Sequence, residues 1–179
     1  MRIISGEFKG RKLYPPSNIK VRPTTDLARE ALFNILRHRL DLESIEALDL
    51  FAGLGSISLE LVSRGAKEVT SVEINGRCID FIKDSCEKLE IKNLHVIKAD
   101  VFRFLGKSQL DFDFVFADPP YDMDNFELVV NLVLKSFLRP GGIFVMEHSK
   151  SNSFEDHEYF IETKKYGKVI FSIFQIPYK

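Results

Sequence analysis

Short continuous apolar runs alternate with segments of helical periodicity between residues 46 and 148. The runs indicate strands buried on both faces, and the segments between them repeat apolar residues every three or four positions, as helices do. The expected strands are 46–51, 68–74, 94–99, 112–117 and 141–148, and the expected helices are 55–65, 75–91, 101–106 and 125–138. This alternation predicts an α/β fold with a parallel sheet covered on both faces.

The two ends of the chain follow other patterns. Glycine and proline interrupt the N-terminal segment 2–22, whose first part, RIISGEFKGRKL, predicts a short hairpin. The next segment has helical spacing and predicts an amphipathic helix over 25–40, capped by Thr24 or Thr25. Near the C-terminus two strand-like runs meet at Tyr166–Gly167, which predicts an antiparallel hairpin that closes the sheet.

Composition and charge narrow the class of protein. The 179 residues are 45% apolar and 28% charged, without a signal-peptide pattern or an apolar run long enough for a transmembrane helix. The two cysteines form no CxxC motif, which predicts a reducing, cytoplasmic environment. We expect one domain over 1–179, with an extension over 1–40 and a core over 41–179. The extension holds nine Lys and Arg against three acids, which indicates either a polyanion site or a solvated basic face.

A glycine-rich turn follows the first core strand in the segment ALDLFAGLGS. Gly53 and Gly55 permit a tight turn and close approach by a ligand, and Glu73 ends the next strand, where an acid can accept both hydroxyls of a ribose. Ser58 stands where a dinucleotide site has its third glycine, and Asp49 would repel a pyrophosphate but suit a cationic amino group. The pattern therefore favours S-adenosylmethionine (SAM) over NAD. The alternative is that Asp49 caps the helix and Glu73 lies on the surface.

A third acid, Asp100, follows the third strand. It can accept a hydrogen bond from the exocyclic amine of an adenine, or it can cap the short helix expected from residue 101, and both roles stay open. The carboxyl ends of parallel strands meet at one edge of a sheet. Asp49, Glu73 and Asp100 are therefore expected to form a set around one ligand.

The fourth strand ends in the stiff sequence Asp118-Pro119-Pro120-Tyr121. Proline cannot donate to a sheet and restricts the residue before it, so the strand stops and a rigid loop begins. Asp118 and the Pro119 carbonyl can each accept an N–H of a planar exocyclic amine, and Tyr121 can stack on its ring. This predicts methyl transfer to such an amine, from a donor held by the neighbouring glycine loop. The alternative is a rigid turn with a buried tyrosine.

These motifs resemble those of class I SAM-dependent amino-methyltransferases. RIISGEFKGRKL, RPTTDLAREALFNIL, ALDLFAGLGS and FADPPY are similar to the RsmD family, which methylates the N2 amine of one guanine in bacterial 16S rRNA. The resemblance implies a Rossmann-like fold with a seven-stranded, mostly parallel sheet of order 3-2-1-4-5-7-6, in which strand 7 is antiparallel. It also implies SAM as the cofactor, no metal, and 16S rRNA or an assembling small ribosomal subunit as the partner of a monomeric enzyme.

The resemblance assigns roles to individual residues. SAM would be held by Asp49, Phe51, Gly53, Gly55, Glu73, Ile74, Asp100 and Val101. The guanine would be held and methylated at Asp118, Pro119, Pro120 and Tyr121. RNA would be contacted by Arg2, Lys9, Arg11 and Lys12 at its phosphates, and by Arg22, Pro23 and Thr24 at the mouth of the site. The chain departs from the family pattern at Leu54 and at Ile57–Ser58.

Other functions share parts of this pattern. Adenine-N6 methylation of DNA or RNA uses the same DPPY sequence, although no separate DNA-reading domain is evident. Methylation of a protein glutamine usually has Asn in place of Asp118. A SAM-binding module without catalysis fits the glycine loop, whereas an NAD-dependent reductase lacks its hydride-transfer residues. The apolar face of the helix 25–40 is expected to pack on the sheet, while the roles of Arg29, Arg37 and Arg39 stay open.

Overall fold

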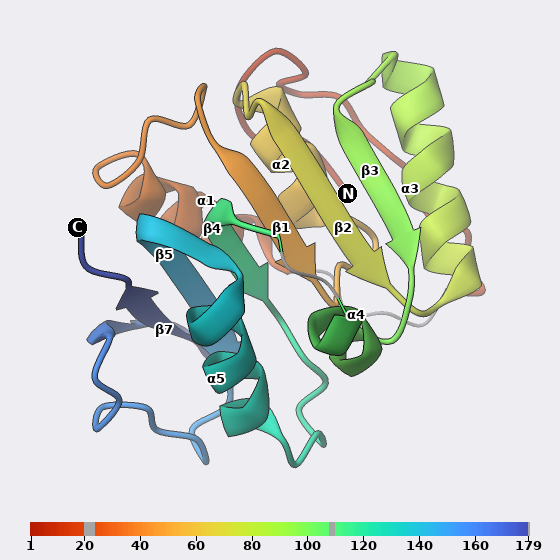
Figure 1. Ribbon diagram of the computed structural model, residues 1–179. Helices are drawn as coiled ribbons and strands as arrows, with labels where there is room; N and C mark the ends of the chain where they lie inside the picture. The colour runs from red at the N-terminus through yellow and green to blue at the C-terminus, as the bar shows by residue number, and fades with distance from the viewer. Residues whose placement is uncertain (20–23, 108–109, 179) are drawn as a thin grey trace.

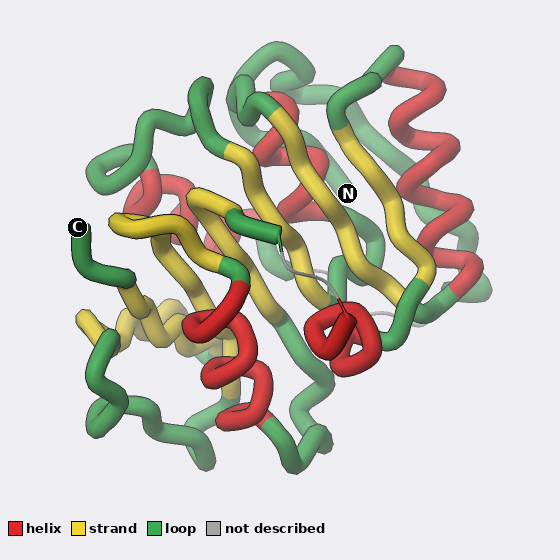
Figure 2. Tube along the Cα trace, viewed as in Figure 1, coloured by secondary structure: helices red, strands yellow, loops and turns green. Residues whose placement is uncertain are grey.

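A single twisted sheet runs through the computed structural model, which describes residues 1–19, 24–107 and 110–178 (Figures 1 and 2). Its strands are β1 (Glu46–Leu50), β2 (Glu68–Glu73), β3 (Leu94–Lys98), β4 (Phe112–Ala117), β5 (Leu138–His148), β6 (Phe160–Tyr166) and β7 (Val169–Gln175). Their order is β3-β2-β1-β4-β5-β7-β6, and β7 is antiparallel to both of its neighbours. The predicted sheet order and the antiparallel seventh strand are confirmed.

Helices cover both faces of the sheet. They are α1 (Asp26–Leu36), α2 (Ser56–Ser63), α3 (Gly76–Leu89), α4 (Val101–Lys107) and α5 (Phe126–Ser136). One apolar cluster packs α1, α2 and α3 on one face, and a second packs α4 and α5 on the other, nearer the viewer in Figure 1. In β4, Phe114 and Phe116 belong to the first cluster, and Val115 and Ala117 to the second. Burial on both faces explains why this strand is a continuous apolar run.

Element boundaries differ from the prediction by three or more residues at two places, and by at most two residues elsewhere. The helix expected over 25–40 ends at Leu36, and beyond a turn Arg39 donates to Glu162 of β6 at 2.6 Å. The residues after Leu36 thus form a turn that contacts a distant strand instead of a further turn of helix. β5 begins at Leu138 rather than at 141, because the strand continues through a proline and two glycines and its pairing with β4 shifts register there.

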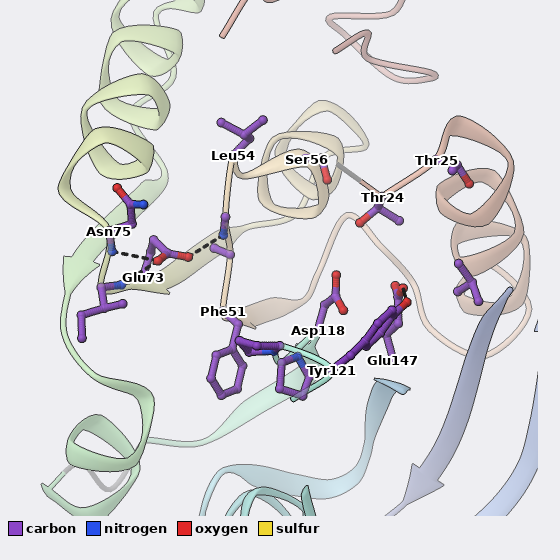
Figure 3. Close-up of a pocket in the computed structure, with 16 residues that line it drawn as sticks. Thr24, Thr25, Phe51, Leu54, Ser56, Glu73, Asn75, Asp118, Tyr121 and Glu147 are labelled. Atoms are coloured by element: carbon purple, nitrogen blue, oxygen red, sulfur yellow. Dashed lines mark hydrogen bonds between the residues drawn. The ribbon is translucent and has the colours of Figure 1, made fainter. Parts of the chain in front are cut away.

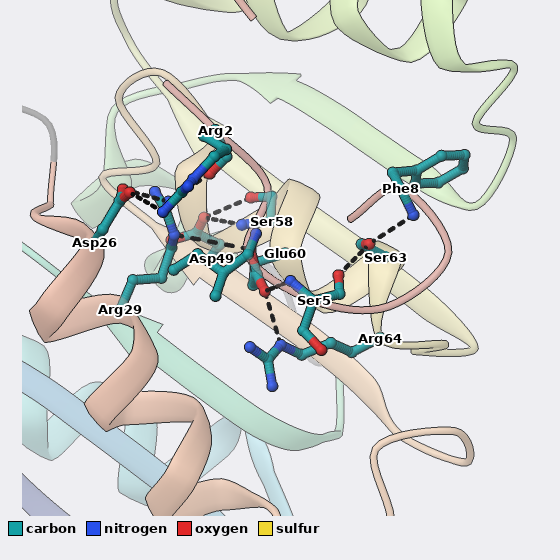
Figure 4. Close-up of polar contacts among 11 residues, drawn as sticks. Arg2, Ser5, Phe8, Asp26, Arg29, Asp49, Ser58, Glu60, Ser63 and Arg64 are labelled. Carbon is teal, nitrogen blue, oxygen red and sulfur yellow. Dashed lines mark hydrogen bonds and ion pairs between the residues drawn. The ribbon is translucent and has the colours of Figure 1, made fainter. Parts of the chain in front are cut away.

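The predicted short N-terminal hairpin is confirmed. The Ile3 N–H donates to the Arg11 carbonyl at 3.0 Å, and the Leu13 N–H donates to the Met1 carbonyl at 2.9 Å. Arg2 and Lys12 form an isolated antiparallel bridge, without flanking strands. The loop lies against the end of α2, where Ser63 Oγ accepts from the Phe8 N–H at 3.0 Å (Figure 4). Gly6 has a φ of +82°, and a Cβ at this position would lie 1.6 Å from the Ser63 carbonyl oxygen. This close approach of two backbones packs the loop of the hairpin tightly on the end of α2.

A buried ion pair ties this loop to the core (Figure 4). Arg29 of α1 is 1% exposed and donates to the Arg2 carbonyl at 2.6 Å and to Asp26 at 2.8 Å. Glu60 of α2, also 1% exposed, accepts from two backbone N–H groups of the N-terminal loop and from Arg64. Buried charges need such partners. Arg29 therefore has a structural role, and it joins the N-terminal loop to the helix that follows the glycine loop.

Candidate active site

A cavity of about 420 Å³ opens at the carboxyl ends of β1, β2, β4 and β5. The glycine loop after β1 and the DPPY loop after β4 both line it (Figure 3). Thr24 and Thr25, at the start of α1, lie across the opening, and Thr25 Oγ1 caps that helix by accepting from the Ala28 N–H at 3.2 Å. The expectation that the two loops form walls of one site is therefore confirmed.

The glycine loop reverses sharply. Phe51, Gly53 and Gly55 have φ values of 57°, 54° and 70°, in the left-handed region. Phe51 is not a glycine, and such backbone strain concentrates at functional sites. Phe51 and Gly53 line the cavity, whereas Gly55 lies behind the loop, where a Cβ would be 2.8 Å from Ile82. Gly55 therefore allows the loop to pack closely on α3 rather than lining the cavity itself.

Glu73, at the end of β2, holds the glycine loop in place. Its Oε2 accepts from the Gly53 N–H at 2.7 Å, and its Oε1 accepts from the N–H groups of Ile74 and Asn75 at 2.9 and 2.8 Å. Glu73 also lines the cavity, beside the exposed Ile74. A carboxylate has about four acceptor positions, so these three bonds leave capacity for a ligand hydroxyl. The alternative that Glu73 is a surface residue is wrong, because it is 8% exposed.

Asp49 does not line the cavity. It is 1% exposed, and its Oδ2 accepts from the Ser58 N–H at 3.1 Å and from the Ser58 hydroxyl, so it caps α2. Burial, partly opposed by the Ser58 hydrogen bonds, raises the pKa of Asp49 to about 7. The Ser58 hydroxyl lies 2.6 Å from that of Ser71 in β2. Ser58, in the place of the third glycine, thus links Asp49 of β1 to Ser71 of β2. The predicted direct contact between Asp49 and a cofactor is not supported by this geometry.

Asp100 and Val101 also lie away from the cavity. Asp100 Oδ1 accepts from the Arg103 N–H at 3.0 Å, which caps α4. Val101 is buried in the apolar cluster under α4. Of the two roles left open for Asp100, the structure shows the cap, and a contact with an adenine stays a prediction.

All four residues of the DPPY loop line the cavity, and the Asp118 carboxylate points into it (Figure 3). Pro119 is buried, whereas Pro120 and Tyr121 are exposed. The alternative of a buried tyrosine is wrong, because Tyr121 is 44% exposed and presents its ring to the cavity.

Sequence reasoning missed several lining residues, and Glu147 is the most important of them. It lies near the end of β5, is 3% exposed and accepts from the Tyr121 hydroxyl at 3.3 Å. The sequence feature that could have identified Glu147 is an acid near the carboxyl end of an otherwise apolar strand. The other missed lining residues are Thr25, Ala52, Leu54, Ser56, Asn75 and Val169.

Acids dominate the electrostatics of the cavity. Among the lining residues that the structure describes, Glu73, Asp118 and Glu147 are acidic and none is Lys, Arg or His. Such a cavity attracts a cation and repels phosphate groups. The described residues contain no cluster of His, Cys, Asp and Glu arranged to hold a metal ion. Within the same residues, no helix has the length and apolar character to cross a membrane.

The predicted RNA-contacting residues fall into four groups. Thr24 lines the cavity, and Arg22 and Pro23 lie outside the described residues. Arg2 pairs with Asp26 at 3.2 Å, which holds the basic N-terminal loop beside the start of α1. The remaining predicted residues, Lys9, Arg11 and Lys12, are exposed. Their contact with RNA stays a prediction.

Comparison with known proteins places the chain in a family. A family model described as conserved hypothetical protein 95, that of the RsmD family, matches residues 1–175. A ribosomal RNA small subunit methyltransferase D from Buchnera aphidicola subsp. Baizongia pistaciae is 32% identical over 152 residues, or 84% of this chain and 77% of that one. The chain belongs to the RsmD family.

Solved structures agree with membership of the RsmD family. The yhhF protein of Escherichia coli matches with a TM-score of 0.87 and 29% identity, over 100% of this chain and 99% of that one. The Thermus thermophilus 16S rRNA N2 G1207 methyltransferase RsmC, solved with AdoMet and guanosine, matches with a TM-score of 0.71 and 26% identity, over 89% of this chain and 44% of that one. The predicted class I methyltransferase fold is therefore confirmed for this RsmD-family chain.

Proposed function

We propose that this protein transfers a methyl group from SAM to the N2 amine of a guanine in 16S rRNA of the small ribosomal subunit. The observation that carries the proposal is a single acidic cavity walled by the glycine loop and by Asp118 of the DPPY loop. Its RsmD-family relatives are named as small-subunit rRNA methyltransferases, and the T. thermophilus neighbour is an N2 guanine methyltransferase.

SAM fits the charge of this cavity. It carries an amino group and a sulfonium and no phosphate, so three acids without a basic neighbour among the described lining residues suit it. The strained glycine loop brings backbone groups to the cavity wall, and Glu73 would accept the ribose hydroxyls. Phe51 and Ile74 would cover its apolar parts. When bound, SAM supplies a methyl group already activated by the sulfonium, so the reaction needs no metal.

The residues of the DPPY loop act on the amine. The lone pair of an exocyclic amine is delocalised into the ring, which makes the nitrogen a poor nucleophile. Asp118 and the Pro119 carbonyl would each accept one of its N–H groups and favour the pyramidal nitrogen of the transition state. Asp118 can then take the proton, because the methylated nitrogen is briefly cationic and acidic. Tyr121 offers an exposed ring for stacking, worth about 1–3 kcal/mol for a base on an aromatic side chain.

The target must be unstacked or single-stranded, because the exocyclic edge of a base inside a duplex cannot reach the end of such a cavity. The exposed basic residues of the N-terminal loop would hold the RNA backbone. Whether naked 16S rRNA or an assembling subunit is bound, and the monomeric state and cytoplasmic location of the enzyme, stay predictions from the sequence.

Mass spectrometry of small-subunit rRNA tests the proposal. Digests from a strain that lacks this protein should lose one N2-methylguanosine that the parent strain contains. Expression of the wild-type protein should restore the modified nucleoside, and expression of the Asp118→Ala variant should not. An unchanged set of methylated guanosines in the deletion strain would exclude this function. A lost N6-methyladenosine would instead favour the adenine alternative.

A further inference from the structure

Glu147 is a buried acid that the reaction described above does not use. β5 pairs with β4, so Glu147 and the DPPY loop reach the cavity from neighbouring strands. The Tyr121 hydroxyl donates to Glu147 Oε1 at 3.3 Å, and the carboxylate lies beside the Tyr121 side chain in Figure 3. An apolar side chain would pack at this strand position without a desolvation cost. A buried acid here therefore indicates a role in the cavity.

A carboxylate in a base-binding cavity selects for hydrogen-bond donors. Guanine carries an N1–H donor next to its N2 amine, whereas N1 of adenine is an acceptor. An N–H donated to a carboxylate makes a strong, charge-assisted bond. The lone pair of adenine N1 would instead face a negative charge. Sites that hydrogen-bond a substrate group reject analogues without it, because the buried polar group is then left unpaired.

We propose that Glu147 determines base specificity by accepting the N1–H of the target guanine, held in position by the Tyr121 hydroxyl. This inference rests on the proposed function and deepens it. Asp118 and the Pro119 carbonyl, in the loop after β4, would bind the N2 amine, and Glu147 of β5 would bind the neighbouring N1–H. Tyr121 then has two tasks: its ring stacks on the base, and its hydroxyl orients the carboxylate that reads it.

Two nucleosides that share the N2 amine reverse the hydrogen-bonding pattern at N1 and at position 6. Guanosine and 2,6-diaminopurine riboside both carry the N2 amine, but N1 donates in the first and accepts in the second. Each would be titrated into the full-length protein with S-adenosylhomocysteine, and binding followed by NMR. The wild type should prefer guanosine by about tenfold or more, the discrimination expected of one good base contact. Glu147→Gln should lose that preference, because a neutral amide can donate to N1 as well as accept from it.

A second acid of the same cavity provides the control. Asp118→Asn should keep the preference for guanosine, although its turnover is lower than that of the wild type. Circular dichroism and thermal melting establish whether Glu147→Gln is folded. If that variant does not fold, binding of 1-methylguanosine to the wild type provides the test. Its methyl group replaces the N1 hydrogen, so it should bind at least about tenfold more weakly than guanosine. Equal binding of these nucleosides by the wild type, or an unchanged preference in Glu147→Gln, overturns the inference.

Turnover separates this inference from the proposed function. The wild type would be incubated with tritiated SAM and small subunits from a strain lacking the protein. No methylated guanosine in that assay means that the proposed function has failed. Methylated guanosine together with an unchanged nucleoside preference in Glu147→Gln means that only the role of Glu147 has failed.

Discussion

At the scale of single residues, Asp118 and Asp49 show how position decides the role of a carboxylate. Both lie at the carboxyl end of a parallel strand, and both carry the same side chain. Asp118 leaves its strand at a proline and points into the cavity. Asp49 still lies inside β1, and its side chain binds the start of α2 beneath the glycine loop. Asp118 is therefore positioned to act on a substrate, whereas Asp49 is positioned to stabilise the fold of the glycine loop.

Asp118→Ala should abolish turnover while leaving SAM affinity nearly unchanged. Asp118 would act on the amine and contribute mainly in the transition state, so its loss should lower kcat by about a hundredfold or more. Calorimetry with SAM and an rRNA methylation assay give the two readings. Asp118→Asn is the matched control, since it keeps one acceptor and should retain more activity than Ala. Full turnover by Asp118→Ala would remove the proposed mechanism.

The buried Asp49 should make stability depend on pH. Its folded pKa, raised from 3.8 to about 7 by burial, means that the folded state holds a proton that the unfolded state releases. The contribution of Asp49 to the free energy of unfolding is fully present below pH 3.8 and is lost as the pH rises towards 7. The asparagine of the Asp49→Asn variant does not titrate, so the variant does not lose this stability as the pH rises. The free energy of unfolding of the variant minus that of the wild type should therefore increase by about 2–3 kcal/mol between pH 5 and pH 8. Urea denaturation at both pH values measures it, and a constant difference would show that folded Asp49 is ionised throughout.

At the scale of elements, the N-terminal loop and α2 form one unit. The loop closes on itself at Arg2 and Lys12, and its middle packs on the end of α2. Arg29 and Glu60 connect both to α1. Since α2 follows the glycine loop, the docking of this distant segment supports the wall of the cavity.

Two glycines of the same loop test this docking. Both Gly6 and Gly10 have a φ of +82°, but a Cβ at Gly6 would meet the Ser63 carbonyl at 1.6 Å, whereas nothing lies within 4 Å at Gly10. Gly10→Ala should cost only the backbone strain, about 1–2 kcal/mol. Gly6→Ala must also push the loop off α2 and should cost at least about 2 kcal/mol more in free energy of unfolding. Equal losses for the two variants, measured by urea denaturation, would mean that the loop does not depend on this contact.

At the scale of the whole molecule, charge is divided between two surfaces. The cavity is acidic, whereas the N-terminal extension is basic, and its Arg2 pairs with Asp26, the residue after Thr25 of the cavity lining. This division suits a cationic methyl donor inside and a polyanionic RNA outside. Positive and negative charges nearly cancel over the whole chain, so its net charge of −1 does not reveal this division.

Removal of the exposed charges of the loop should weaken RNA binding specifically. A Lys9→Gln, Arg11→Gln, Lys12→Gln variant should bind small-subunit rRNA more weakly, and the slope of log affinity against log salt should fall by about 2–3. SAM affinity should not change, because none of the three lines the cavity. A matched variant, Lys83→Gln, Lys88→Gln, Lys92→Gln, removes three exposed lysines in and just beyond α3. An equal loss of rRNA affinity in both variants would show that binding depends on the total charge of the protein rather than on the N-terminal loop.

Local pattern alone determined most of the architecture. Apolar runs and helical spacing predicted nearly every element, since burial on one or two faces leaves a period in the sequence. The DPPY loop was also predictable, because proline restricts its own backbone and that of the residue before it. The sheet order and the family came from a resemblance carried by several motifs together.

Only the tertiary structure decided where the polar side chains lie. The sequence indicated the helix cap for Asp49 only as an alternative, and it could not show that Arg29 is buried against Glu60 or that Glu147 reaches the cavity. Each of these depends on a contact with another element: α2 for Asp49, the N-terminal loop for Arg29, and the DPPY loop for Glu147. Periodicity records which face of an element is buried, but not which group from another element meets it there.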